Sequence, residues 1–317
     1  MEKETVVFLV GPTACGKTDM AIQIAQHMDA EIVSADSVQI YEKLDIGSAK
    51  PTKKQLTQVR HHMIDILPLT CADFSASAYQ QRAEQTIDHL HTRNKRALVT
   101  GGTGFYIQSL TDAMHFSFVG KDQAFRDTWQ EREESDAGCA HRALAEIDSA
   151  AAAKLHPNDV QRVIRALEVE HITGVPMSRH QQHTRRQAGK YHMIMAGLTM
   201  PRAQLYERIN LRVDHMMAEG WVEEVKAILA EGYSPALPAL RTIGYKEIIA
   251  ALRGEYTMEE AAERIKLATR HYAKRQWTWF RRDERIRWFD VTDYLNQEEM
   301  MQQILEHVSG RSSCGVL

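Results

Sequence analysis

The sequence predicts an α/β fold, a parallel β-sheet flanked by helices, with an inserted all-helical domain. Short apolar segments rich in β-branched residues alternate with helical patterns through the first third of the chain, and this alternation is typical of a parallel sheet covered on both faces. Residues 116–190 are instead charge-rich and helical with no convincing strand, and a strand pattern returns at 192–198. We therefore expect a core of residues 1–115 and 191–317, interrupted by a helical domain of residues 116–190.

Turn and capping residues separate the expected elements in the first part of the chain. Apolar strands are expected at residues 5–10, 31–35, 63–67 and 97–100. A helix follows the first strand at about 17–27, and another runs to about residue 92 from a cap at Asp73 or Ser75. A run of glycines follows the fourth strand, after which a helix restarts at Phe105.

After the inserted domain, the chain has the pattern of a strand, several helices and a last strand. The helices are expected to begin near Arg202, Trp221, Tyr245 and Thr257, and the strands to span 192–198 and 286–289. Thr257 is followed three residues later by Glu260, the spacing of a capping box at the start of a helix. The tail from 310 to 317 is expected to be disordered.

The composition is that of an ordinary globular protein. Hydrophobic residues make up 44% and charged residues 26% of the 317, and the net charge of −3 does not by itself indicate a nucleic-acid partner. The four cysteines have no metal-ligand spacing, and we see neither a signal peptide nor an apolar run that could cross a bilayer. We expect a cytoplasmic monomer with free thiols and no membrane partner.

Residues 11–18, GPTACGKT, carry the clearest motif. They fit G-x-x-x-x-G-K-[ST] between a strand and a helix, the context that a phosphate-binding P-loop requires. Its glycines let backbone N–H groups turn toward an anion, and the helix N-terminus adds a favourable dipole. Lys17 supplies a positive charge and Thr18 a hydroxyl for Mg²⁺. We expect a P-loop NTPase-like sheet with phosphate bound by Gly11, Thr13, Ala14, Cys15, Gly16, Lys17 and Thr18.

The strand ends beside this loop indicate which phosphate chemistry to expect. NTPases place a Mg²⁺-binding carboxylate at the end of an apolar strand, but the strand at 97–100 ends in Thr100 and glycines. Because the carboxyl ends of parallel strands form the ligand crevice, Asp36, Thr103 and the P-loop should converge there. Three roles fit Asp36: a metal ligand, a general base acting on a second substrate, or a helix cap. The local sequence does not choose between the two functional roles.

Seven segments stand in order along the chain: GPTACGKT, ADSVQIY with DIGSAKP, HHMID, GGTGFY, NDVQRVIRALEV, LRTIGYKE and AKRQWTWFR. In this order the chain resembles the tRNA isopentenyltransferase family over roughly residues 6–281. Cys15 departs from the family's loop, which usually has Ser, but its side chain need not touch the phosphates. The resemblance implies that a dimethylallyl group moves from dimethylallyl diphosphate to the exocyclic amine of the adenosine just 3′ of the tRNA anticodon.

The resemblance also implies roles for individual residues. Asp36 would accept the proton of the amine, and Asp36 and Thr103 would both contact the tRNA near the reacting nucleotide. Lys17, Thr18 with Mg²⁺ and the loop amides would stabilise charge on the departing diphosphate. The other expected tRNA contacts are Ser37, Val38 and Gln39 beside the adenosine, Arg126, Gln161, Arg162, Val163, Ile164 and Arg165 in the inserted domain, and Arg241, Lys246, Lys274, Arg275 and Arg281 near the C-terminus.

The distribution of charge favours an RNA surface independently. Between Arg264 and Arg287 there are nine Lys or Arg residues and two acidic ones. In a helix, Arg264, His271, Arg275 and Arg282 form one stripe, with Arg270, Lys274 and Arg281 beside it. The apolar face would comprise Ala261, Ile265, Ala268, Tyr272 and Trp279, so Trp279 is expected in the core. The inserted domain adds Arg162, Arg165, Arg179, Arg185, Arg186 and Lys190. Two basic regions beside a phosphate loop favour a large polyanion such as tRNA.

Several alternatives remain at this point. A small-molecule P-loop kinase shares the fold and the loop, and an adenylate isopentenyltransferase shares the chemistry but needs no RNA surface. A non-enzymatic RNA-binding protein could use the nucleotide as a switch. His61 and His62 are adjacent on an expected strand end, where neighbouring side chains point to opposite faces, so we expect packing or substrate contacts there and no metal pair. For the transferase, the adenosine must flip out of the loop stack to reach the donor.

Overall fold

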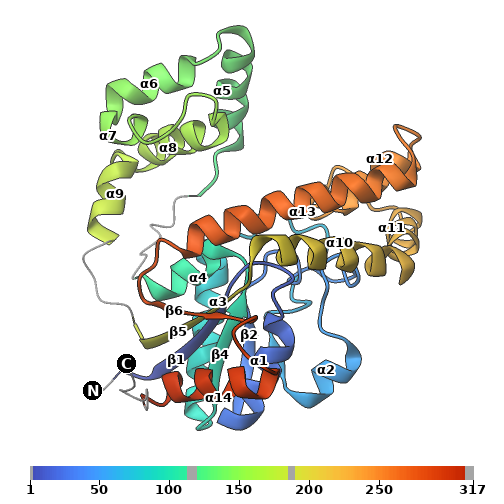
Figure 1. Ribbon diagram of the computed structural model, residues 1–317. Helices are drawn as coiled ribbons and strands as arrows, with labels where there is room; N and C mark the ends of the chain where they lie inside the picture. The colour runs from blue at the N-terminus through green and yellow to red at the C-terminus, as the bar shows by residue number, and fades with distance from the viewer. Residues whose placement is uncertain (1–2, 113–119, 185–189, 311–317) are drawn as a thin grey trace. The chain divides into compact units, whose positions relative to one another are not determined.

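The structure is a computed structural model that describes residues 3–112, 120–184 and 190–310 (Figure 1). Its sheet has six strands in the order β3-β2-β4-β1-β5-β6, and all neighbouring strands are parallel. The strands are β1 (Thr5–Val10), β2 (Ala30–Ser34), β3 (His61–His62), β4 (Arg96–Gly101), β5 (His192–Thr199) and β6 (Ile286–Asp290). The predicted parallel α/β sheet is confirmed.

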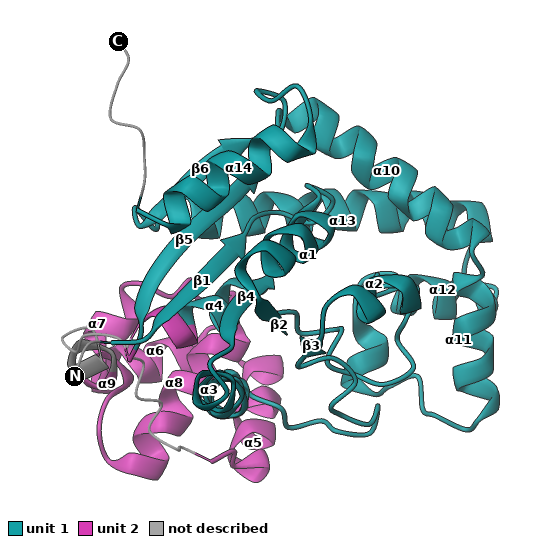
Figure 2. Cartoon of the chain, turned by 90° about the horizontal axis from the view of Figure 1, so that it is seen from below, with its two compact units in different colours: residues 1–108, 191–317 teal, residues 109–190 magenta. Residues whose placement is uncertain are grey.

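The inner strand β1 is apolar toward both faces of the sheet, and helices cover both. Val7 and Leu9 contribute to a core with α1 (Lys17–Met28) and α14 (Gln297–Val308) on one face. On the other face lies α3 (Ala76–Thr92), which begins at the N-cap Ser75 and buries Tyr79 and Ile87 completely (Figure 2). With the faces covered, the loops after the carboxyl ends of the strands are left to form the functional site.

The third strand is shorter and earlier than the sequence predicted. A strand was expected at 63–67, but β3 ends at His62 because Met63 and Asp65 have φ angles of 63° and 52°. Residues in this left-handed region cannot continue a strand. Two short helices were not anticipated: α14, and α2 (Lys53–Gln58), which has a capping box between Thr52 and Gln55.

Four α-helices and one 3-10 turn follow β5, close to where the sequence placed helix starts. They are α10 (Arg202–Ala218), α11 (Trp221–Ala230), η1 (Pro238–Arg241), α12 (Tyr245–Leu252) and α13 (Met258–Phe280). Thr257 and Glu260 form the predicted capping box of α13, with each backbone N–H bonded to the other side chain at 3.2 Å. Trp221, Tyr245 and Ile265 belong to a second core that these helices share with the segment after β2. The predicted tail lies outside the described residues beyond Gly310.

The chain divides into two compact units, residues 1–108 with 191–317 and residues 109–190 (Figure 2). The boundary falls within α4 (Gly104–Thr111), whose last three residues belong to the second unit. The helices of the second unit are α5 (Gln123–Ser135), α6 (Cys139–Ile147), α7 (Ser149–Ala152), α8 (Val160–Thr173) and α9 (Met177–Thr184). Leu144, Val163 and Leu167 lie in a core of its own. Residues 116–119 and the basic Arg185 and Arg186 lie outside the described residues. Across the described ranges, no helix is both long and apolar enough to cross a membrane.

Candidate active site

The loop between β1 and α1 is shaped to receive an anion. Gly11 and Gly16 have φ angles of 142° and 93°, and a Cβ added to Gly11 would lie 2.4 Å from the carbonyl oxygen of Leu198. Glycine is therefore required at residue 11. Gly16 precedes α1 as its N-cap, which leaves the first N–H groups of the helix without intrahelical partners. Lys17 Nζ donates to the Pro12 carbonyl at 2.7 Å, along the wall of the loop.

Two hollows share the functional groups of this loop. A cavity of about 80 Å³ is lined by Asp36, Tyr272 and Gln276 among others, and a cleft of about 1510 Å³ extends past residues 14–20 along α10. The side chains that line both hollows include Lys17, Thr18 and Arg212. A bound anion at this shared boundary would therefore meet two cations and a hydroxyl, with Asp36 on the cavity side only.

Arg212 is a site residue that the sequence did not reveal. It lies on α10, two hundred residues after the loop, and Nη1 donates to Thr13 Oγ1 at 3.5 Å. Burial lowers the pKa of Arg212. Burial also lowers the pKa of Lys17, with a further lowering from Arg212, whereas Cys15 and Asp36 oppose the change. Two desolvated cations side by side favour binding of a dianion or trianion between them.

Asp36 follows the end of β2, and the turn after it holds its carboxylate. Oδ1 accepts hydrogen bonds from the backbone N–H of Val38 at 2.8 Å and of Gln39 at 3.3 Å. The backbone N–H of Ser37 donates to Thr103 Oγ1 at 3.0 Å, and that hydroxyl donates to Ser37 Oγ at 3.2 Å. The structure therefore brings Asp36 and Thr103 together at the carboxyl ends of β2 and β4, beside the P-loop.

Gln276 ties the P-loop to the glycine loop after β4. This residue of α13 is 5% exposed; Oε1 accepts from the Thr13 N–H at 2.8 Å, and Nε2 donates to the Gly102 carbonyl at 2.9 Å. A Cβ on Gly102 would lie 2.1 Å from Nε2, so the glycine permits this close approach. Tyr272, one turn earlier, lines the same cavity, and burial raises the pKa of its phenol, a shift that the charge of Asp36 increases. Tyr272 therefore stays protonated beside the carboxylate.

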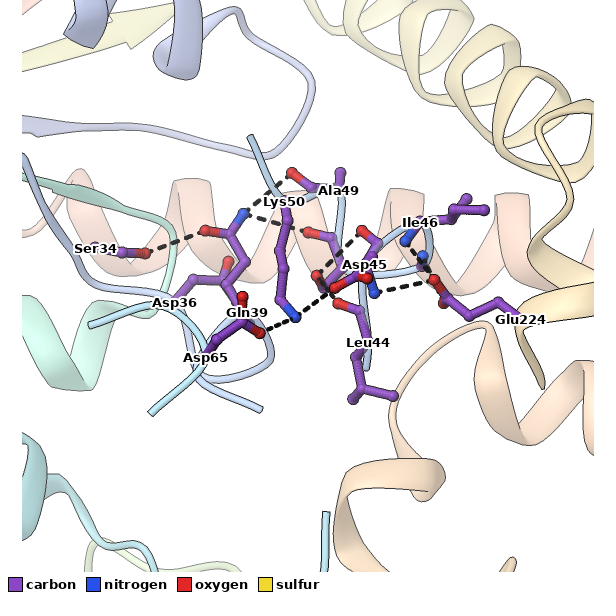
Figure 3. Close-up of polar contacts among 12 residues, drawn as sticks. Ser34, Asp36, Gln39, Leu44, Asp45, Ile46, Ala49, Lys50, Asp65 and Glu224 are labelled. Atoms are coloured by element: carbon purple, nitrogen blue, oxygen red, sulfur yellow. Dashed lines mark hydrogen bonds and ion pairs between the residues drawn. The ribbon is translucent and has the colours of Figure 1, made fainter. Parts of the chain in front are cut away.

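Figure 3 shows how the segment after Asp36 is braced from within the protein. Gln39 Nε2 donates to the carbonyl oxygens of Ser48 and Ala49 at 3.3 and 3.2 Å, and Oε1 accepts from Ser34 Oγ at 3.1 Å. Glu224 of α11 accepts three backbone N–H groups of the same loop at 2.7–3.3 Å. The amide of Gln39 is thus engaged in fixing the cavity wall, so its contribution to an adenosine site would be mainly to position neighbours.

His61 and His62 face opposite sides of the sheet, as predicted. The His61 ring lines the small cavity, and its Nδ1 lies 2.8 Å from the Val59 carbonyl. Burial lowers the pKa of His61. His62 Nε2 instead lies 2.6 Å from Glu31 Oε2. One histidine therefore belongs to the site wall, and the other contacts Glu31 at the edge of the sheet.

Five residues expected to contact tRNA lie on α8 and differ in burial. Gln161 and Arg162 are exposed, whereas Val163 and Ile164 are 0% and 4% exposed and pack into the core of the helical unit. Arg165 is half-buried. An RNA on this surface would therefore meet Gln161 and Arg162 and not the side chains of Val163 and Ile164.

Arg126, a further predicted RNA contact, is bonded to the same carboxylate as Arg165. Arg126 holds the fully buried Glu168 through two hydrogen bonds of 2.7 and 2.6 Å, and Arg165 bonds to it as well. Burial would raise the pKa of Glu168, but Arg126 and Arg165 outweigh it and lower the pKa to about 2. Both arginines have a structural task within the helical unit.

The basic face of α13 is exposed, but the prediction for Trp279 was wrong. The exposed cations are Arg264, Lys274 and Arg275 on α13, its C-cap Arg281, and Arg282 in the turn beyond it, because the helix ends at Phe280. Arg241 and Lys246 are exposed before it. Trp279 was expected in the core and is 37% exposed. Trp279 is exposed because the end of α13 passes the glycine loop after β4. Its indole lies against Gly104 and not among core side chains.

The site offers oxygen ligands suited to Mg²⁺. The hydroxyl of Thr18 and the carboxylate of Asp36 both line the small cavity, and hard oxygen donors are what Mg²⁺ prefers. Within the described residues, no group of three or more His, Cys, Asp or Glu could hold a metal. A phosphate-bound Mg²⁺ that keeps several waters needs only one or two protein ligands, so these residues fit it.

Comparison with known proteins places the chain among enzymes that modify tRNA. A family model described as "IPP transferase" matches residues 39–283. The chain is 44% identical to a tRNA dimethylallyltransferase of Caldanaerobacter subterraneus (96% of this chain, 98% of that protein) and 43% identical to one of Bacillus subtilis (98% of each). The crystal structure of a tRNA isopentenylpyrophosphate transferase from Bacillus halodurans matches with a TM-score of 0.73 and 37% identity over 98% and 97% of the two chains. A eukaryotic dimethylallyltransferase acting on tRNA matches with a TM-score of 0.83 and 25% identity over 98% and 81%.

Proposed function

The chain belongs to the IPP transferase family, and we propose that, as a tRNA prenyltransferase, it transfers a dimethylallyl group from dimethylallyl diphosphate to the N6 amine of the adenosine 3′-adjacent to the anticodon. One observation carries the proposal: Lys17, Thr18 and Arg212 stand at the boundary of cleft and cavity, with Asp36 on the cavity side. An anion-binding group on one side and a proton acceptor on the other are what amine prenylation needs.

The donor would use the cleft and the acceptor the cavity. A diphosphate reaching the loop through the cleft meets the α1 N-terminus, Lys17 and Arg212, and its allylic carbon then points toward the cavity. Apolar side chains such as Met200, Leu211 and Met216 line the cleft and suit a hydrocarbon chain in transit.

The reaction joins the amine nitrogen to C1 of the dimethylallyl group as the bond from C1 to the diphosphate oxygen breaks. The nitrogen loses its proton to the carboxylate of Asp36, which the N–H groups of Val38 and Gln39 keep in place through Oδ1. Charge grows on the leaving diphosphate, and Lys17, Arg212 and the loop amides stabilise it. Thr18 would hold Mg²⁺, which would neutralise part of that charge. Thr103 accepts a hydrogen bond from the backbone N–H of Ser37 and so helps to position the segment that follows the general base Asp36.

We propose RNA contacts on each of the two units. The exposed Lys274 and Arg275 of α13 and its C-cap Arg281 would bind phosphates, and Gln161 and Arg162 of α8 would contact the anticodon loop. Phosphate contacts of this kind position an RNA without reading its sequence. We expect the enzyme to act as a monomer.

A prenylation assay with an anticodon stem-loop RNA, dimethylallyl diphosphate and Mg²⁺ tests the proposal, with the modified nucleoside identified by mass spectrometry. We expect one dimethylallyl group on the adenosine next to the anticodon. ATP consumption without base modification would indicate a small-molecule kinase instead. Strong activity on free AMP and none on RNA would indicate an adenylate isopentenyltransferase.

A further inference from the structure

Two aromatic side chains are exposed beside the glycine loop after β4, Phe105 at the start of α4 and Trp279 near the end of α13. Phe105 is 43% and Trp279 is 37% exposed, and their rings meet edge to face with centroids 6.3 Å apart. Gly104 lies between the loop and the indole: a Cβ there would come within 2.3 Å of Trp279 Cδ1. The glycine thus lets the indole pack flat against the loop backbone. Two exposed aromatic rings in contact offer a flat apolar surface on which another ring can stack.

The position of this pair relates it to the reacting base. Phe105 is two residues from Thr103, whose hydroxyl bonds to Ser37 next to Asp36. On α13, Trp279 lies four residues after Arg275, so the indole shares its side of the helix with this exposed cation, and the exposed Arg282 follows in the turn after the helix ends at Phe280. Exposed aromatic rings between cations form the surface that binds single-stranded RNA, because the rings stack on bases while the cations bind phosphates.

We propose that Phe105 and Trp279 form a stacking platform for a nucleobase of tRNA that flanks the reacting adenosine. Flipping a base out of a stack leaves each neighbour without one stacking partner, at a cost of a few kcal/mol. An aromatic platform two residues from Thr103 would replace that partner and so favour the flipped state. The proposal rests on the proposed function, since it requires an RNA substrate whose adenosine is extruded.

A thermodynamic cycle between protein and RNA tests the platform. Stem-loop RNAs are compared that carry either a normal base or an abasic nucleotide at the 5′ or the 3′ neighbour of the adenosine, with the wild type and the Trp279→Ala variant. We expect Trp279→Ala to weaken RNA binding about tenfold or more. We also expect an abasic neighbour, on one of the two sides, to weaken wild-type binding by a similar factor and to have little further effect in the variant. The proposal would be overturned if, for the 5′ and for the 3′ neighbour alike, the loss of affinity from the abasic nucleotide and the loss from Trp279→Ala multiplied in the combination.

Three controls separate stacking from damage to the fold or the charge. Trp279→Phe keeps a ring and should recover most of the affinity, and Phe105→Ala should show the same insensitivity to the abasic site if Trp279→Ala fails to fold. The slope of affinity against salt should stay unchanged in Trp279→Ala, because no cation is removed. A changed slope, or no recovery by Phe, would indicate a structural role and refute the platform.

A prenylation assay on the same RNAs distinguishes failure of the proposed function from failure of the stacking platform. If the wild type does not prenylate the stem-loop RNA at all, the proposed function itself is wrong. If it prenylates the RNA and the two losses multiply, only the stacking platform is wrong.

Discussion

At the scale of single residues, the catalytic claim depends most on Asp36, whose carboxylate the following turn fixes through Val38 and Gln39. Its replacement by Asn keeps the shape of the side chain but removes the proton acceptor. We expect Asp36→Asn to reduce single-turnover prenylation by roughly 10²-fold or more, with little change in tRNA affinity. Rapid-quench kinetics and a filter-binding assay measure the two quantities separately.

The matched control for Asp36 is Asp214→Asn on α10. Asp214 is exposed and pairs with Lys266 away from the cavity, so its loss should leave the rate within about twofold of the wild type. A full rate in Asp36→Asn would remove this residue as the general base.

Arg212 tests the second half of the site, the stabilisation of the leaving group. Methionine at this position keeps much of the hydrocarbon and removes the charge beside Lys17 and Thr13. We expect Arg212→Met to lower kcat/KM for dimethylallyl diphosphate by about 10²-fold while RNA affinity stays the same. Steady-state kinetics with each substrate varied in turn give the values.

Arg202→Met is the control. Arg202 lies on the same helix, and its guanidinium donates a hydrogen bond of 3.0 Å to the Tyr206 hydroxyl, not to the P-loop. If Arg212→Met weakened RNA binding and donor binding equally, Arg212 would not be specific to the diphosphate.

At the scale of elements, α13 contributes to both the cavity and the basic surface. Its inner side supplies Gln276 and Tyr272 to the cavity, Arg275 is exposed beside Tyr272, and the exposed Arg282 follows in the turn after the helix ends at Phe280. The start of α13 is fixed by the capping box of Thr257 and Glu260, which was predictable from sequence. Its exposed stripe was also predictable from helical periodicity, whereas the orientation of Trp279 depended on the glycine loop that it meets.

The basic face of α13 leads to a prediction about salt. We expect the double variant Arg275→Gln with Arg282→Gln to bind anticodon stem-loop RNA more weakly and to lower the slope of log affinity against log salt by about 1–2 units, since each lost phosphate contact removes roughly 0.7–0.9. Binding titrations over a range of KCl concentrations measure it. Arg253→Gln, exposed at the end of α12, is the control and should leave the slope unchanged. If the slope were unaltered in the double variant, Arg275 and Arg282 would be solvent-exposed residues that do not contact RNA phosphates.

At the scale of the whole molecule, the chain has two units with separate cores, so local changes should destabilise one and leave the other. Glu168 belongs to the helical unit alone, where it is buried between Arg126 and Arg165. Its pKa is lowered from 4.5 to about 2, so its contribution to stability is complete above about pH 4.5 and is lost as the pH falls toward 2.

Replacement of Glu168 by Gln should therefore destabilise the helical unit at neutral pH by about 3 kcal/mol, because two partly buried arginines lose their counter-charge. Hydrogen exchange followed by mass spectrometry resolves the two units, and protection should fall in residues 120–180 but not in the sheet. The difference between variant and wild type should shrink as the pH approaches 2. Glu134→Gln, an exposed position on α5, is the control. A uniform loss of protection across the chain would mean that the units unfold together.

The sequence by itself determined the sheet strands other than the third, the P-loop and the position of Asp36, because each depends on residues close together in the chain. Glycines with positive φ shape the loop at residues 11–18, and an apolar run fixes β1. The strand expected at 63–67 failed for a related reason, since nothing in its apolar pattern shows that Met63 and Asp65 adopt left-handed backbone angles.

Only the tertiary structure decided which distant side chains complete the site. Arg212 and Gln276 reach Thr13 from helices 199 and 263 residues later in the chain. No local pattern marks Arg212, and the segment AKRQWTWFR, which contains Gln276, does not show that this side chain reaches the P-loop. A helix offers several faces of similar polarity, and packing against the rest of the protein selects the one that turns toward the loop. For the same reason, Val163 and Ile164 are buried in the helical unit, and Trp279 lies at the surface beside Gly104.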